Sequence, residues 1–187
     1  MEVNVQLTDG FVLLRPYVSE DTPRLHEAAM ESQPQIQAWM GWCPPDYAIE
    51  TSRAWVADRP EKWAQGAAYE FAITDPRDGT YLGGCGLNGI NTGARFCNLG
   101  YWVRTSRTKK GVATAATRLL ARFAFAELKL QRLEIVVATA NLASQRVATK
   151  AGATREGVLR NRYPTTQGPA QDAVMFSLIP EDLAIKS

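Results

Sequence analysis

The 187-residue chain is 45% hydrophobic and 21% charged, which allows one sizeable core and is short for two domains. Its formal net charge is +2, and no basic tract is longer than the pair Lys109 and Lys110, so a nucleic-acid-binding surface is not expected. Three widely spaced cysteines indicate neither a disulfide framework nor a zinc site, and they fit a reducing compartment. We therefore expect one soluble, cytoplasmic domain without a nucleic-acid partner.

The sequence also argues against secretion, membrane insertion and histidine chemistry. The first ten residues contain charges and no apolar core, and no run of about eighteen apolar residues occurs, so we expect neither a signal peptide nor a membrane span. His26 is the only histidine, which excludes a multi-histidine metal site. It lies in a predicted helix without an acidic or hydroxyl partner pattern, so we expect a surface or half-buried residue and no metal site.

The first third of the chain predicts a strand, a helix, an irregular segment and a second helix. Residues 11–15 are rich in β-formers, and residues 19–23 supply cap and first-turn positions for a helix. Residues 33–46 hold too many prolines and aromatics for a regular exposed element, so we expect an ordered loop or broken helix over a cleft. Residues 48–63 are expected to form the second helix.

Three strand-like runs follow, at 69–74, 81–87 and 95–103. The short links between them are rich in Gly and Asp, which predicts an antiparallel meander. Apolar residues then recur with helical spacing from 111 to about 128, and 133–138 is a continuous β-branched run. A strand, a helix and a strand in this order need a right-handed crossover, so part of the sheet should be parallel.

The last part of the chain predicts a short helix and two strands. Asn141 is suited to begin the helix, and Gly152 to close it as a left-handed C-cap. The strands are expected at 158–160 and 173–179.

The junction between the strand at 95–103 and the helix after it predicts an anion site. A helix N-terminus leaves backbone N–H groups unpaired and adds the positive end of the helix dipole. Gly111 lets the backbone approach a ligand, and Arg107, Lys109 and Lys110 add mobile positive charge. This junction is therefore expected to bind a phosphate group.

Glu70 is the only acidic residue on the predicted meander strands. The alternation of Tyr69, Phe71 and Ile73 places its carboxylate on the opposite face of the sheet. If that face lines a cleft, Glu70 could act as a general base, directly or through water. The alternative is a solvated glutamate on a strand.

Several segments together resemble a known family. They are LLRP at 13–16, WMGW at 39–42, YLGGCGL at 81–87, LGYWV at 99–103, KKGVAT at 109–114 and NLASQRVATKAGATREGVLRN at 141–161. In this order and spacing the chain resembles the GNAT superfamily of acyl-CoA-dependent N-acetyltransferases, and more narrowly its RimJ/RimL type, the ribosomal-protein N-terminal acetyltransferases. The resemblance implies a mixed α/β fold whose splayed, mostly antiparallel sheet has six or seven strands with helices on both faces, in one domain over residues 11–182.

The resemblance also implies acetyl-CoA as the coenzyme. The pyrophosphate loop of the family falls on Thr108, Gly111 and Ala113, where Thr108 departs from the usual Gln or Arg and Lys109 takes a position that is often Gly. The backbone at 101–103 would hydrogen-bond the pantetheine arm and can point N–H groups at the thioester oxygen. The implied coenzyme-binding residues are Tyr101, Trp102, Val103, Arg107, Thr108, Lys109, Lys110, Gly111, Val112, Ala113, Thr114, Asn141, Ser144 and Lys150.

Ser144 is, by the same resemblance, a candidate general acid, and Asn141 a pantetheine contact. The presence of one of these two residues at the start of the helix is explained equally well by helix capping. Lys150 could contact the nucleotide or simply favour the helix dipole. Relatives can carry a glutamate after this helix, but residues 160–163 have none, so Glu70 remains the candidate base.

The resemblance implies direct acetyl transfer to a primary amine in a ternary complex, with the N-terminal amine of a protein as the expected acceptor. Such an α-amine, with a pKa near 7.7–8.0, is substantially neutral at pH 7 to 8, whereas a lysine near 10.4 is not. The expected acceptor-binding residues are Trp39, Met40, Trp42 and Glu70. The alternative for the first three is that their side chains pack in the core.

Two other functions stay open on the sequence. One is an acetyltransferase acting on a small-molecule amine such as an amino acid, a polyamine or an aminoglycoside. The other is a non-catalytic acyl-CoA-binding regulatory module. A homodimer is compatible with the sequence, although no residue pattern fixes a two-fold interface.

Overall fold

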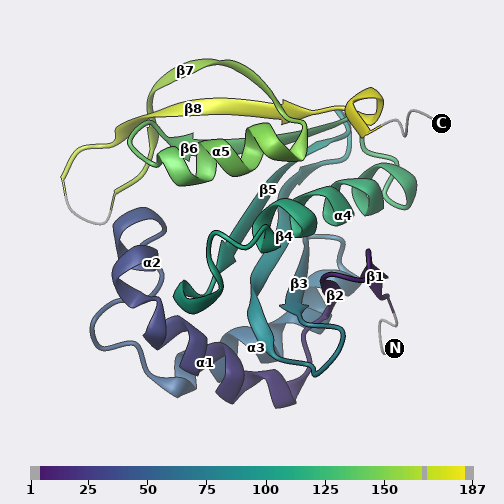
Figure 1. The fold of residues 1–187 in the computed structure, drawn as a ribbon. Coiled ribbons are helices and arrows are strands. Elements are labelled where there is room, and N and C mark those ends of the chain that lie inside the picture. The colour runs from purple at the N-terminus through teal and green to yellow at the C-terminus, as the bar shows by residue number, and fades with distance from the viewer. Residues whose placement is uncertain (1–4, 166–167, 184–187) are drawn as a thin grey trace.

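The computed structural model describes residues 5–165 and 168–183, which fold around one open sheet of eight strands (Figure 1). In spatial order the strands are β1 (Leu7–Thr8), β2 (Leu13–Pro16), β3 (Ala68–Thr74), β4 (Tyr81–Asn91), β5 (Phe96–Val103), β6 (Arg132–Ala138), β8 (Gln171–Leu178) and β7 (Thr154–Tyr163). The α-helices are α1 (Thr22–Glu31), α2 (Gln33–Trp39), α3 (Ile49–Ala64), α4 (Val112–Ala126) and α5 (Leu142–Ala151). Short 3-10 helices lie at η1 (Ser19–Asp21), η2 (Thr105–Arg107) and η3 (Pro180–Leu183).

The sheet is antiparallel except where β5 meets β6. β3 to β5 form the predicted meander, and β1 and β2 extend it as further antiparallel strands. α4 makes the predicted crossover to the parallel β6. Only Phe96, Cys97 and Asn98 of β5 pair with β6, after which the two strands separate. The expected mixed, splayed sheet is therefore confirmed.

Two details of the strands differ from the expectation. The sheet has eight strands instead of six or seven, because β1 has only two residues and carries no detectable periodicity. β7 covers Thr154–Tyr163 rather than 158–160, and most of its side chains are exposed. An exposed strand lacks the apolar alternation on which a strand is recognised in a sequence.

Helices cover both faces of the sheet, as expected. Phe71 and Ile73 of β3 pack in the main core with buried residues of α4 such as Leu120. On the opposite face, Ala72 packs with Leu25 of α1 and other residues of α1 and α3. In Figure 1 the long helix α4 and the short helix α5 lie on the near side of the strands, whereas α1 and α3 lie below them.

The segment at 33–46 is a broken helix, one of the two expected forms. α1 ends at Glu31, and α2 begins directly after Ser32 with Pro34 in its first turn. α2 ends at Trp39, and the loop that follows it buries Cys43. The break places the end of α2 beside the end of β7 and the start of β8 (Figure 1).

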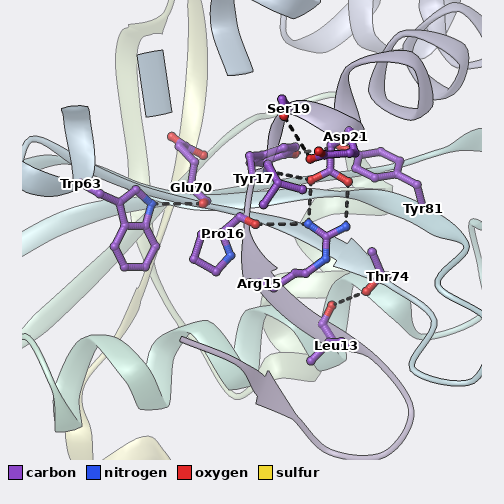
Figure 2. A network of polar contacts seen from close by, with 12 residues as sticks. Leu13, Arg15, Pro16, Tyr17, Ser19, Asp21, Trp63, Glu70, Thr74 and Tyr81 are labelled. Carbon is purple, nitrogen blue, oxygen red and sulfur yellow. Dashed lines mark hydrogen bonds and ion pairs between the residues drawn. The ribbon is translucent and has the colours of Figure 1, made fainter. Parts of the chain in front are cut away.

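A buried ion pair ties β2 to the start of α1. The guanidinium of Arg15 donates to both carboxylate oxygens of Asp21, at 2.6 and 2.7 Å (Figure 2). Asp21 is fully buried and also accepts from the backbone N–H of Val18 at 3.0 Å. The hydrogen bond to Asp21 is the main cause that raises the pKa of Arg15. The chain reversal from β2 into α1 is thus held by charge as well as by apolar contacts.

Candidate active site

The predicted anion site falls on the loop from β5 to α4. Thr108 is extended, Lys109 has φ 61°, and Gly111 has φ 87° at the N-cap of α4. The left-handed φ at Lys109 is one that Gly adopts at lower cost, which agrees with the expectation that this position is often Gly. Lys109, Lys110 and Gly111 are exposed, so both the charges and the backbone can reach a ligand.

The first turn of α4 supplies free N–H groups next to these charges. Gly111 has no side chain that could cap the helix, and the amides of Val112, Ala113 and Thr114 precede the first intrahelical donor, Ala115. The side chain of Val112 is buried in the main core and fixes the start of the helix. The combination of free amides and mobile cations fits a diphosphate.

The splay exposes one backbone edge of β5. Tyr101, Trp102 and Val103 pair with β4 on one side, but β6 no longer pairs with β5 beyond Asn98. Their second edge is therefore open to a peptide-like chain, as the pantetheine arm of a coenzyme requires. The side chains of Tyr101 and Trp102 point to opposite faces and pack in different clusters.

Tyr101 joins β5 to α5 through Ser144. The Tyr101 hydroxyl donates to the backbone oxygen of Ser144 at 3.0 Å and lies 3.0 Å from its Oγ. Because a tyrosine has one hydroxyl proton, the Ser144 hydroxyl donates to Tyr101 in this arrangement. Burial raises the pKa of Tyr101 to about 12, although the hydrogen bond with Ser144 lowers it. Tyr101 is therefore protonated at neutral pH.

Asn141 acts as the N-cap of α5. Its Oδ1 accepts from the backbone N–H of Ser144 at 3.0 Å. This confirms the capping explanation for Asn141, whereas the Ser144 hydroxyl takes no part in the cap and contacts Tyr101 instead. Lys150 lies exposed in the last turn of α5, where its carbonyl oxygen accepts from the Arg118 guanidinium.

Glu70 lies on the sheet face covered by α1 and α3. It pairs with Gly86 of β4, which pairs with Gly100 of β5. A Cβ placed on Gly86 would be 1.8 Å from Oε2 of Glu70, so the carboxyl group lies across Gly86. A Cβ on Gly100 would have Asn98 Nδ2 as its nearest neighbour at 4.0 Å. The carboxyl group therefore points along a row of glycines toward open space near the place where β5 leaves β6.

The environment of Glu70 raises the pKa of its carboxyl group. Burial raises the pKa of Glu70 to about 7, although the charge of Arg59 and a hydrogen bond with Asn88 lower it. The backbone oxygen of Glu70 accepts from Trp63 Nε1 at 3.3 Å, which fixes the strand beside the carboxyl group (Figure 2). Glu70 is half-buried in its strand, so it is partly shielded from water, and its role as a base stays a prediction.

A pocket of about 380 Å³ lies where α2 meets the ends of β6, β7 and β8. Its lining includes Trp39 and Met40, Ala138 of β6 and Tyr163 of β7. The Tyr163 hydroxyl donates to the backbone oxygen of Trp39 and so joins two walls of the pocket. Trp42 does not line it; its ring packs edge-on against Trp102, with centroids 5.4 Å apart. Trp39 and Met40 thus lie at a cavity, and Trp42 does not.

His26 lies in α1. The His26 ring is half-buried, as expected, and stacks on Tyr47 with centroids 5.8 Å apart. Within residues 5–165 and 168–183 no three His, Cys, Asp or Glu side chains gather as a metal site would require. In the same ranges, no helix combines the length and the apolar character that spanning a bilayer demands.

Residues 12–154 match the family model described as "Acetyltransferase (GNAT) domain". The chain belongs to the GNAT acetyltransferase family. This GNAT acetyltransferase is 33% identical over 137 residues to YjcK of Bacillus subtilis, which is named as an N-acetyltransferase, covering 73% of this chain and 76% of YjcK. It is 28% identical over 169 residues to YdaF of the same organism, which carries the name of a ribosomal N-acetyltransferase, covering 90% and 91% of the two chains.

Solved structures agree with this assignment. The structure of Mycobacterium smegmatis RimJ in complex with CoA-disulfide superposes with a TM-score of 0.85 at 25% identity, covering 96% of this chain and 87% of RimJ. The GNAT acetyltransferase is thus an acetyl-CoA-dependent enzyme. The open β5 edge, the φ values at Lys109 and Gly111 and the free amides of α4 fit that coenzyme. The residues that could hold it are still the predicted ones at 101–103 and 107–114, with Asn141, Ser144 and Lys150.

Some residues of this site had no signal in the sequence. Arg59 and Asn88 lie on the neighbouring elements α3 and β4 and act on Glu70 only after folding. Tyr163 contacts Trp39 across 124 residues. The sequence could suggest Tyr163 only as an aromatic residue in an otherwise polar segment.

Proposed function

We propose that this GNAT acetyltransferase transfers the acetyl group of acetyl-CoA directly to the N-terminal α-amine of a protein, in a ternary complex and through one catalytic domain over residues 11–182. Acetyl-CoA supplies the activated thioester. The observation that carries the proposal is the carboxyl group of Glu70, which lies across Gly86 and points toward the gap at the splay. Burial raises the pKa of the Cys85 thiol well above its usual range, which argues against a covalent route through that residue.

Glu70 is proposed as the general base. An α-amine must lose a proton as it attacks the thioester, and a base works best when its pKa lies near the working pH. The pKa of Glu70, raised by burial to about 7, is matched to an α-amine with a pKa near 7.7–8.0. A lysine side chain would need a much stronger base. The match therefore favours an N-terminal acceptor.

Ser144 is proposed as the general acid on the other face of the sheet. Its hydroxyl is held by Tyr101 at 3.0 Å, and it can give its proton to the departing thiolate while Tyr101 keeps it oriented. Glu70 and Tyr101 belong to opposite faces, so the base and the acid approach the splay from opposite sides. The open backbone edge at 101–103 is proposed to hydrogen-bond the thioester oxygen as negative charge develops there.

The acceptor is proposed to enter beside the pocket at the end of α2. Among the residues that the structure describes, the pocket lining combines aromatic, apolar and uncharged polar side chains and contains no carboxylate. A polycation such as a polyamine or an aminoglycoside would find no opposite charge in it, whereas a peptide could use its backbone donors and acceptors. YdaF carries the name of a ribosomal N-acetyltransferase, and a ribosomal protein is accordingly the proposed substrate class.

The test is to incubate the enzyme and acetyl-CoA with peptides that have free or blocked N-termini, with lysine-containing peptides and with polyamines, and to locate the acetyl group by mass spectrometry. Acetyl on free N-termini is expected. Acetyl only on lysine or small amines would contradict the acceptor. Glu70→Gln should lower kcat by about a hundredfold and remove the rise of the wild-type rate through pH 7. Binding of CoA without turnover of any amine, including those in a cell extract, would indicate a non-catalytic module.

A further inference from the structure

The short helix η2, which leads into the coenzyme loop, is capped by residues from the end of α1. The backbone N–H of Ser106 donates to Oε1 of Glu31 at 2.7 Å, and the N–H of Thr105 donates to Oγ of Ser32 at 3.0 Å. These contacts join residues 75 and 73 positions apart in the chain. The N-cap residue itself, Arg104, makes no capping hydrogen bond. The conformation of η2 therefore depends on a distant helix.

Arg104 neutralises the charge of Glu31. Its guanidinium donates to Oε2 of Glu31 at 2.8 Å through Nε and to Oε1 of Glu27 at 2.8 Å through Nη2. The Arg104 side chain is only 14% exposed. An unpaired carboxylate close to a diphosphate site would repel the ligand, but the ion pair removes most of that repulsion. The arrangement can thus use the carboxylate as a cap without a large electrostatic cost.

Glu31 is held as a carboxylate at all working pH values. Burial alone would raise its pKa, but the hydrogen bonds from Arg104 and from the Ser106 amide outweigh burial and lower the pKa of Glu31 to about 2. The cap is therefore always ionised, and hydrogen bonds to a charged acceptor are the stronger kind.

We infer that Glu31, together with Ser32, is a positioning residue for the coenzyme diphosphate. The two side chains fix η2, and η2 fixes the start of the loop in which Lys109 and Gly111 adopt left-handed φ values and present their amides. Neither side chain is placed against the coenzyme itself; they act through the backbone of Thr105 and Ser106. The inference rests on the proposed diphosphate site at residues 107–114.

The junction between α1 and α2 also leads to the pocket proposed for the acceptor. Glu31 and Ser32 connect α1 to α2, and Thr105 Oγ1 also donates to Oε1 of Gln35 in α2 at 3.1 Å. α2 then ends at Trp39 in the wall of the acceptor pocket. The coenzyme loop and the acceptor pocket are thus built on one helix junction.

The test compares Glu31→Ala with Glu27→Ala. Both changes remove one carboxylate from Arg104, but only Glu31 also caps Ser106, so Glu27→Ala is the matched control. Glu31→Ala should weaken CoA binding, measured by titration calorimetry, by about tenfold, and Glu27→Ala by less than about twofold. The kcat/KM for acetyl-CoA should fall likewise, whereas kcat/KM for S-acetylpantetheine, which has the thioester arm but no diphosphate, should stay within about twofold of wild type for both variants.

Ser32→Ala keeps the size and charge of the site and provides a second variant with little risk to folding. It removes the cap on Thr105 and should weaken CoA binding about threefold, again without an effect on S-acetylpantetheine. Unchanged CoA affinity in Glu31→Ala and Ser32→Ala would overturn the inference. So would an equal loss with both thioesters, which would indicate general structural damage. If the wild-type enzyme itself bound CoA no better than S-acetylpantetheine, the diphosphate site would fail instead.

Discussion

The carboxyl group of Glu70 occupies the place where any other residue at position 86 would have its side chain. A Cβ on Gly86 would be 1.8 Å from Oε2 and 2.3 Å from Cδ of Glu70. Only glycine at position 86 leaves room for the Glu70 carboxyl group to lie against the sheet and reach the gap beyond Gly100. Gly86 has no positive φ, so the requirement comes from space and not from the backbone conformation.

Gly86→Ala is accordingly expected to displace the Glu70 carboxyl group while the fold persists, because the far end of a flexible side chain can move. We expect kcat to fall at least about tenfold and CoA affinity to stay near the wild-type value. Steady-state kinetics and calorimetry measure the two. Gly157→Ala in β7 is the matched control, since no heavy atom lies within 4 Å of its new Cβ. Equal activity in both variants would show that the position of Glu70 is unimportant.

The raised pKa of Glu70 predicts a pH-dependent effect on stability. The usual pKa of a glutamate is 4.5, and that of Glu70 in the folded chain is about 7. Between these two pH values, Glu70 has lost its proton in the unfolded chain but keeps it in the folded chain. The folded state therefore binds more protons, and its stability falls as the pH rises through this window. Glu70→Gln removes this loss and should raise the thermal midpoint by a few degrees (about 3 °C) at pH 8 and by much less at pH 5.

Thermal unfolding at the two pH values measures this difference. Glu127→Gln, a change at an exposed carboxyl group near the end of α4, should leave the thermal midpoint unchanged at both. If Glu70→Gln did not raise the thermal midpoint at pH 8, the Glu70 carboxylate of the folded protein would be well solvated.

Ser144 and Tyr101 should contribute unequally to the rate. Ser144→Ala removes the hydroxyl proposed to protonate the thiolate and should lower kcat by about a hundredfold with little change in CoA affinity. Tyr101→Phe removes only the hydroxyl that orients Ser144 and should cost less than about fivefold. Pre-steady-state CoA release distinguishes the two. The reverse order of effects would transfer the role of acid to Tyr101.

The ion pair between Arg15 and Asp21 should matter for stability. Asp21→Asn leaves the Arg15 guanidinium without its charged partner in a buried place and is expected to lower the free energy of unfolding by about 3 kcal/mol. Glu50→Gln, which breaks the exposed pair with Arg53 at 3.5 Å, should cost less than about 0.5 kcal/mol. Urea unfolding measures both, and similar values would show that the buried pair contributes no more than a surface pair.

The sequence by itself determined the order of the elements and the local conformations. The antiparallel meander, the crossover through α4, the left-handed Gly152 and the face on which Glu70 lies all follow from patterns of a few neighbouring residues. Such patterns depend on backbone sterics, turn chemistry and side-chain alternation, which act over short stretches of chain. β1 and most of β7 escaped detection because two residues, or a strand exposed along most of its length, carry too little of that alternation.

Only the tertiary structure decided which side chains meet. Glu31 caps Ser106 across 75 residues, Tyr101 contacts Ser144 across 43, and Trp42 packs against Trp102 instead of lining the pocket at the end of α2. The raised pKa of Glu70 likewise exists only where other segments remove water from its carboxyl group. Desolvation and long-range hydrogen bonds depend on neighbours that folding brings together, and no local pattern in the chain encodes those neighbours.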